Sequence, residues 1–275
     1  MEVGQAITIW VDESTEITLG NDSYNLVGYL ITNSDSEEFN FLDSLKQSRK
    51  VSPSCWTCLH GSEMAATDTR KINLLDRWVT LFKNNESVGF HCFLYKRDER
   101  FIQQGHTYEH YFAKQSVFAL ANKMRRRNGY VVNSMFKDIS TLTVLFDRRR
   151  SHAARIVRNG AVVQIDRLHE LEGIYKEEIS NQIHRISGKN TNEENFTVRF
   201  SFLSSECFDA MQLSDCLLYL VRKKLEQETT GESNIYTEMF DTHFLNDLDE
   251  HTKSIGFKKI YEFDKKLNFF EAHSN

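Results

Sequence analysis

A short, almost wholly apolar run over residues 141–146 ends abruptly at Asp147, and it constrains the fold of this chain more than any other feature. Runs this rich in apolar residues are typical of a strand that is covered on both faces. Such strands occur where helices pack on the two sides of a parallel or mixed sheet. We therefore expect a central strand over residues 141–146, with Asp147 at its carboxyl end.

Hydrophobic periodicity predicts the remaining elements. Alternation over residues 6–11 predicts a strand that ends at Asp12, and the turn signal at residues 21–23 indicates that residues 24–31 return antiparallel to it. The polar stretch over residues 33–38 is expected to be a loop. Further strands are expected over residues 88–95 and 196–202, and helices over residues 70–83, 108–127, 165–186 and 209–227.

An antiparallel hairpin followed by alternating strands and helices predicts an α/β fold, with a mixed sheet of about five strands flanked by helices. No proline- or glycine-rich linker divides the 275 residues, so we expect a single domain over residues 1–275. Helical insertions are expected at about residues 33–85 and 105–140, and a C-terminal extension at about residues 230–275.

The composition favours an intracellular globular protein. The apolar fraction of 40% and the aromatic fraction of 12% are too high for a disordered chain. No stretch approaches the roughly 20 apolar residues that a membrane span needs. Five scattered cysteines do not form a disulfide framework. We expect a cytoplasmic protein without membrane association, and the sequence leaves open a homo-oligomer or a partner protein.

A basic cluster follows the apolar run, although the net charge is −5. Arg148, Arg149 and Arg150 come directly after Asp147, where they are candidates for contacts with nucleic-acid phosphates. A second cluster over residues 123–127 ends the expected helix over residues 108–127. The alternative is that both clusters are simply solvated.

Three separated aspartates occupy informative places. Asp12 and Asp147 end expected strands, and Asp215 lies near the start of the last long helix. In open α/β sheets, ligands bind beyond the carboxyl ends of the strands. Carboxylates that converge there repel one another unless cations neutralise them, and hard oxygen ligands suit Mg²⁺ or Mn²⁺. Taken singly, each aspartate is better explained as a helix cap, a turn former or a solvated charge; the case for a metal site depends on the three together.

Four short blocks in the chain resemble those of the family called domain of unknown function 3800, in the family's order. They are Trp10-Val11-Asp12-Glu13-Ser14, Leu59-His60-Gly61-Ser62-Glu63-Met64, Val144-Leu145-Phe146-Asp147-Arg148-Arg149 and Met211-Gln212-Leu213-Ser214-Asp215-Cys216-Leu217. The resemblance implies a ribonuclease-H-like fold and metal ligands at Asp12, Asp147 and Asp215. Two positions depart from the family pattern: Thr15 stands where glycine is usual, and Ser214 where alanine is common.

Four further residues are candidates for supporting roles. In a regular strand Glu13 points away from Asp12, so it either supports the ligands or is structural. His60 is a candidate to shuttle a proton or to orient a ligand carboxylate, and Glu63 accompanies it in the same block. Glu206 precedes the last helix, where capping competes with a role near Asp215.

The pair Cys55 and Cys58 has the spacing of a zinc or redox motif. A zinc site needs a second ligand pair of comparable quality, and the sequence offers only scattered candidates such as His91 and Cys92. Structural zinc is therefore disfavoured.

These observations predict a nuclease that hydrolyses phosphodiester bonds of DNA or RNA with Mg²⁺ or Mn²⁺, by a two-metal type of mechanism. The alternative is a module that binds nucleic acid or protein on the same scaffold without catalysis. A nucleotide hydrolase such as an actin-like ATPase ranks last, because the sequence contains no glycine-rich phosphate loop.

Overall fold

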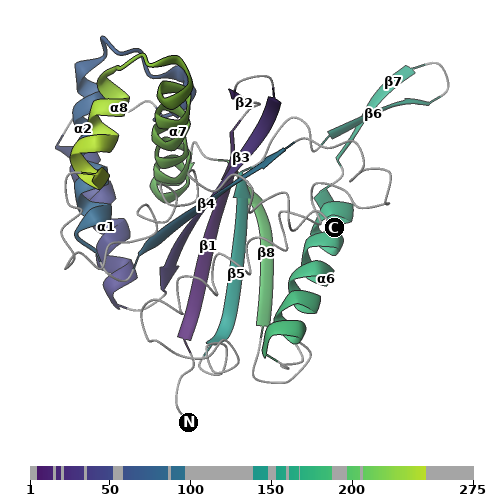
Figure 1. Cartoon of the computed structure of the whole chain (residues 1–275). Coiled ribbons are helices and arrows are strands. Elements are labelled where there is room, and N and C mark those ends of the chain that lie inside the picture. Colours follow the sequence, from purple (N-terminus) through teal and green to yellow (C-terminus); the bar gives the residue numbers. More distant parts are fainter. Residues whose placement is uncertain are drawn as a thin grey trace.

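The computed structural model describes most of the sheet and the helices that cover it (Figure 1). The described residues are 5–14, 17–19, 22–33, 36–51, 58–85, 88–96, 139–147, 153–158, 161–166, 168–187, 197–204 and 207–245. The expected helix over residues 108–127, the insertion at about residues 105–140 and the end of the C-terminal extension lie outside them.

The central sheet contains six strands in the described part of the chain. They are β1 (Gln5–Glu13), β2 (Ile17–Leu19), β3 (Asp22–Asn33), β4 (Gly89–Lys96), β5 (Ile139–Asp147) and β8 (Thr197–Leu203). Strand β4 pairs with one edge of β3 over most of its length, opposite both β1 and β2. Strands β1 and β2 therefore follow each other along the other edge of β3. The sheet therefore has five strand positions, in the order β4, β3, β1 with β2, β5, β8.

Strand direction completes the fold. Strands β1, β5 and β8 run parallel, and β3 runs against both β1 and β4. Four of the five positions thus share one direction, and the second from the β4 edge is reversed. This mixed sheet of five positions with helices on its faces is a ribonuclease-H-like α/β fold, as the sequence predicted.

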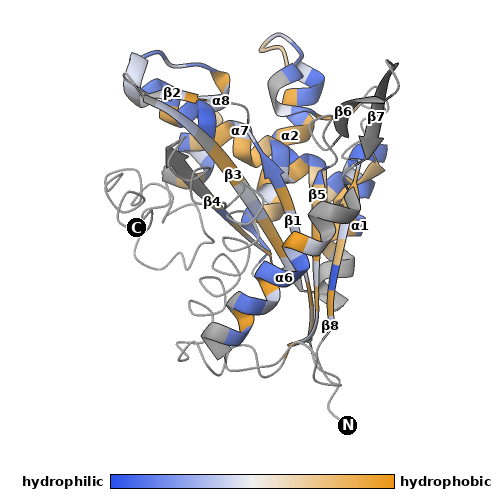
Figure 2. Ribbon diagram, turned by 90° about the vertical axis from the view of Figure 1, so that its right-hand side faces the viewer, coloured by the Kyte–Doolittle hydropathy of each residue, from blue (hydrophilic) through white to orange (hydrophobic). Residues whose placement is uncertain are grey.

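Helices cover both faces of the sheet (Figure 1). One face carries α1 (Ser36–Lys50), α2 (Thr69–Lys83), α7 (Asp209–Thr230) and α8 (Ile235–Phe240), whose buried side chains form one cluster with Trp10 and Leu30. The other face carries α6 (Leu168–Ser187), on which Tyr175 lies 4.3 Å from Phe146 between ring centroids. Figure 2 shows hydrophobic and hydrophilic residues alternating along α6, as expected for a helix with one buried face.

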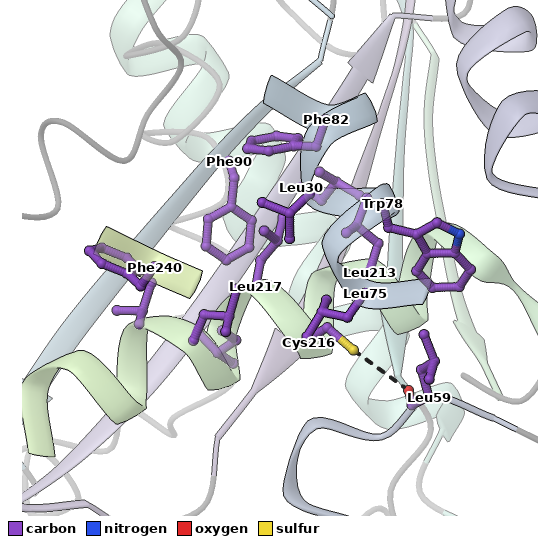
Figure 3. Packing of buried hydrophobic residues seen from close by; sticks show 14 of the residues in the cluster. Leu30, Leu59, Leu75, Trp78, Phe82, Phe90, Leu213, Cys216, Leu217 and Phe240 are labelled. Atoms are coloured by element: carbon purple, nitrogen blue, oxygen red, sulfur yellow. Dashed lines mark hydrogen bonds between the residues drawn. The ribbon is translucent and has the colours of Figure 1, made fainter. Parts of the chain in front are cut away.

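Strand β5 is covered on both sides, as its sequence predicted. Phe146 packs on α6, whereas its neighbour Leu145 packs against the cluster on the α7 face. Successive side chains of a strand point to opposite faces, so Asp147 shares the face of Leu145. The hydrophobic cluster beneath α7 is shown in Figure 3.

Two sequence predictions were wrong in part. Residues 33–38 were expected to be a loop, but α1 begins at Ser36. Its first three residues are polar and its buried residues Phe41 and Leu45 come later, so hydrophobic periodicity did not mark the start of the helix. The helix expected from residue 165 begins at Leu168, since Ile165 belongs to a hairpin of β6 (Ala153–Arg158) and β7 (Ala161–Asp166). These two strands pair with each other in a separate two-stranded sheet.

None of the helices in the part of the chain that the structure describes is long and apolar enough to span a membrane.

Gly28 and Gly173 provide a matched pair of substitutions that tests the packing of α7 on the sheet. A Cβ at Gly28 would lie 2.8 Å from Cζ of Phe90 and 3.1 Å from Cδ1 of Leu218, whereas a Cβ at Gly173 in α6 would meet nothing within 4 Å. We expect Gly28→Ala to lower the free energy of unfolding by about 1–3 kcal/mol through overpacking. We expect Gly173→Ala to raise it by roughly 0.5–1 kcal/mol, because alanine favours helix. Urea unfolding measures both, and equal effects would contradict the close approach at Gly28.

Candidate functional site

Asp12 and Asp147 lie side by side at the carboxyl ends of two adjacent parallel strands. The register of β1 and β5 pairs Val11 with Phe146, so the residues that follow each of them are level. Trp10 and Leu145 both pack against the cluster on the α7 face, and strand alternation places Asp12 and Asp147 on this same face. The two carboxylates therefore share one edge and one face of the sheet.

Asp12 is a buried carboxylate, with only 6% of its surface exposed. Its Oδ1 accepts a hydrogen bond of 2.9 Å from the backbone N–H of Glu13, which orients the carboxylate. A carboxylate in this position is costly unless hydrogen bonds or cations compensate for the lost water. Glu13 is half-buried, and as the next residue of β1 it points to the opposite face, as the sequence predicted for a regular strand.

Helix α7 brings Asp215 to this edge of the sheet. The hydroxyl of Ser214 donates to the carbonyl oxygen of Trp10 at 3.4 Å, two residues before Asp12. The helix also crosses β3 at Gly28, which pairs with Asp12 in the β1–β3 ladder. These contacts hold the start of α7 against β1, beside Asp12.

A second face of α7 binds the segment 58–61, which contains the second sequence block. Three residues of α7 make these contacts. Oδ2 of Asp215 accepts a hydrogen bond of 2.9 Å from the N–H of Gly61, and Oε1 of Gln212 accepts one of 2.9 Å from the N–H of Leu59. The thiol of Cys216 lies 4.0 Å from the carbonyl oxygen of Leu59 (Figure 3). Positions 212, 215 and 216 share one face of a helix, because residues three and four apart are neighbours there.

Position 61 has room only for glycine. A Cβ at this position would lie 2.4 Å from Cβ and 2.8 Å from Cγ of Tyr219, one turn after Asp215. The one described glycine with a positive φ is Gly231, so the requirement at Gly61 is close approach rather than backbone conformation. The missing side chain lets the backbone of the segment reach Asp215.

His60 lies against the same carboxylate. Its Nδ1 is 3.5 Å from Oδ2 of Asp215, and both side chains are about a quarter exposed. The hydrogen bond to Asp215 raises the pKa of His60 above its usual value of 6.5; burial opposes this effect, and the charges of Glu63 and Asp147 add to it. Glu63 itself is exposed, in the short 3-10 helix η1 (Gly61–Glu63).

The three aspartates act electrostatically on one small region. Asp147 and Asp215 both raise the pKa of His60, as described. Burial raises the pKa of the Cys216 thiol well above its usual range, and the charges of Asp215 and Asp12 raise it further. Carboxylates from both strand ends and from α7 thus act on the same small region, and such an arrangement of negative charges attracts cations.

The carboxylate oxygens of the three aspartates suit Mg²⁺ or Mn²⁺. The described residues do not, however, form a ready-made site with three ligands. Among the described residues, no group of three or more His, Cys, Asp or Glu side chains lies close enough together to hold a metal ion. Mg²⁺ is often bound through one or two carboxylates, with waters and substrate phosphates as the other ligands. The level carboxylates of Asp12 and Asp147 fit this kind of site, with Asp215 bonded to Gly61 and His60 beside them.

Several candidates from the sequence lie outside the described residues. They are Glu206, Arg148, Arg149, Arg150 and Cys55. Cys58 is described, and its Sγ accepts a hydrogen bond of 3.5 Å from Nε2 of Gln212. The roles of Gln212, Gly61 and Ser214 were missed by the sequence analysis, although all three lie within the quoted blocks.

No protein-family model matches the sequence, and no curated protein matches it. Among solved structures, the chain is similar to ribonuclease H2 from Pyrococcus horikoshii OT3, at 12% identity and a TM-score of 0.39, over 94% of this chain and 99% of that one. It is also similar to ribonuclease HII from Archaeoglobus fulgidus in its PCNA complex, at 11% identity and a TM-score of 0.37, over 87% and 89% of the two chains. The strand order and strand directions described above define the fold of this chain.

Substitution of Gly61 tests the docking of the segment. We expect Gly61→Ala to cost about 1–3 kcal/mol of unfolding free energy, because the added methyl group overlaps Tyr219. The displaced backbone should also weaken the Gly61–Asp215 hydrogen bond, which amide hydrogen exchange of Gly61 would report. An unchanged exchange rate in Gly61→Ala would contradict the close approach.

The pKa of His60 gives a second test, by NMR titration in metal-free protein. We expect a value above 6.5 in the native chain and a lower value in Asp215→Asn, since the hydrogen bond is the largest cause of the shift. A raised pKa stabilises the fold below about pH 6.5, and this contribution is lost as the pH rises through the folded-state value. Asp215→Asn should therefore cost more stability at about pH 5.5 than at about pH 8.5. The opposite order would contradict the His60–Asp215 interaction.

Proposed function

We propose that this chain is a divalent-metal-dependent nuclease that hydrolyses phosphodiester bonds of DNA or RNA. The observation that carries the proposal is the level pair Asp12 and Asp147 at the ends of adjacent parallel strands, with Asp215 on the helix that packs over the same face. We also propose membership in the domain of unknown function 3800 family, which the four sequence blocks support.

Asp12 and Asp147 are the proposed metal ligands from the sheet, and Asp215 is the proposed ligand from α7. Bound Mg²⁺ or Mn²⁺ would polarise the scissile phosphate and lower the pKa of an attacking water, and a pair of ions would stabilise both the attacking and the leaving oxygen. The protein orients the carboxylates for this role. The N–H of Glu13 holds Asp12, and the N–H of Gly61 holds Oδ2 of Asp215.

His60 is the proposed proton carrier of the site. It lies beside Asp215, partly exposed, where a substrate can reach its ring. The raised pKa keeps a larger fraction of the imidazole protonated near neutral pH, which suits donation of a proton to a leaving oxygen. Glu63 adds negative charge near His60 and is proposed to support this state.

The nucleic-acid backbone is proposed to contact Arg148, Arg149 and Arg150, which follow Asp147 directly in the sequence. Phosphate contacts of this kind position a strand without reading its bases. Their position next to Asp147 favours a nucleic acid as the substrate class.

Cleavage assays with Asp147→Asn test the proposal. We expect the native chain to cleave single- or double-stranded DNA or RNA with Mg²⁺ or Mn²⁺ and to stop when EDTA is added. Asp147→Asn should lose activity by at least about 10²-fold with its fold intact, because neutral amide oxygen binds the cation weakly. The matched control is Asp43→Asn, which changes an exposed aspartate on α1.

Full cleavage by Asp147→Asn would overturn the metal assignment. Nucleic acid bound equally with and without Mg²⁺, and never cut, would instead support a binding module on this scaffold.

A further inference from the structure

A buried polar link connects α1 to the segment that carries His60 and Gly61. Gln212 of α7 is only 2% exposed, and its Oε1 accepts two hydrogen bonds. One comes from Nη2 of Arg49 at 2.6 Å, and the other from the N–H of Leu59 at 2.9 Å. Because both partners are donors, the amide oxygen must lie between them, which fixes the orientation of the side chain.

Arg49 is itself held in place. It lies in the last turn of α1, and its Nε lies 2.8 Å from Oδ1 of Asp209 in the first turn of α7. Its guanidinium also lies 4.9 Å from the ring centroid of Trp78, which is fully buried. A planar guanidinium that bonds two partners and stacks on an aromatic ring has little freedom to move.

The link ends at the candidate site. Leu59, whose side chain is fully buried, is followed directly by His60 and Gly61, the two residues that contact Asp215. The position of the Leu59 backbone therefore determines where the Gly61 N–H and the His60 ring lie.

We propose that Arg49 and Gln212 are positioning residues that hold the segment 58–61 so that Gly61 and His60 orient the carboxylate of Asp215. Neither residue is one of the proposed metal ligands, and both act through the backbone of this segment. The expected effect of these residues on cleavage rests on the proposed function. Their expected effect on the position of segment 58–61 rests on the hydrogen bonds alone.

Three variants separate positioning from general stability. Gln212→Met keeps the size of the side chain but removes the oxygen that accepts from the Leu59 N–H and from Nη2 of Arg49. Gln212→Glu keeps an acceptor oxygen for both donors. Ile179→Val is the stability control, because Ile179 is fully buried in α6 on the opposite face of the sheet.

The first readout is the Gly61 amide, followed by NMR chemical shift and hydrogen exchange in metal-free protein. Gln212→Met should shift this resonance toward its position in Asp215→Asn and increase its exchange, whereas Gln212→Glu and Ile179→Val should leave it near the native position. If Gln212→Met does not fold, Arg49→Lys takes its place and should move the Gly61 resonance in the same direction by less. A Gly61 amide that stays unchanged in folded Gln212→Met, or in Arg49→Lys where that variant replaces it, would overturn the proposal.

The second readout is the Mn²⁺ concentration that gives half-maximal cleavage. We expect Gln212→Met to raise it about tenfold, because residues that orient metal ligands typically contribute factors of roughly 10–100 in affinity or activity. Gln212→Glu should retain most of the native affinity. If Gln212→Met alters the Gly61 amide but the native chain cleaves nothing, the proposed function is refuted and the positioning role is not. If Gln212→Met cleaves with the native dependence on Mn²⁺, the positioning role is refuted.

Discussion

The packing of α7 across β1 and β3 is the contact on which the rest of the site depends. Gly28 removes the side chain that would separate Leu218 from the sheet, and Ser214 bonds the backbone of Trp10. The helix is thereby held beside the end of β1 that carries Asp12. Without this contact, the carboxylates of Asp12 and Asp147 would lie at an open edge of the sheet with no third carboxylate near them.

Two faces of α7 serve two different functions. The face with Ser214 and Leu218 packs on the sheet, and the face with Gln212, Asp215 and Tyr219 holds the segment 58–61. A helix can do both because residues three and four apart align while intervening residues point elsewhere. The buried polar groups on both faces have hydrogen-bond partners, so the packing does not leave them uncompensated.

Local signals in the sequence predicted the strand ends and missed the contacts between distant segments. Alternation and apolar runs located β1, β3, β5 and β8 and placed Asp12 and Asp147 at carboxyl ends, because these patterns depend on neighbouring residues. The bond between Leu59 and Gln212 joins residues 153 positions apart, and no periodicity encodes it. The need for glycine at position 61 depends in the same way on Tyr219, which lies on a distant helix. The spacing of Gln212, Asp215 and Tyr219 on one face of α7 was a visible signal for a docked segment.

A crystal of the native chain soaked in Mn²⁺ would show whether Asp12 and Asp147 bind a divalent cation. Anomalous scattering at the manganese edge locates the ion without reference to any activity. We expect a peak in contact with the carboxylates of Asp12 and Asp147, on the side of Asp215, and loss of this peak in Asp147→Asn. A soaked crystal with no peak at these carboxylates, or with manganese bound only elsewhere, would contradict this expectation.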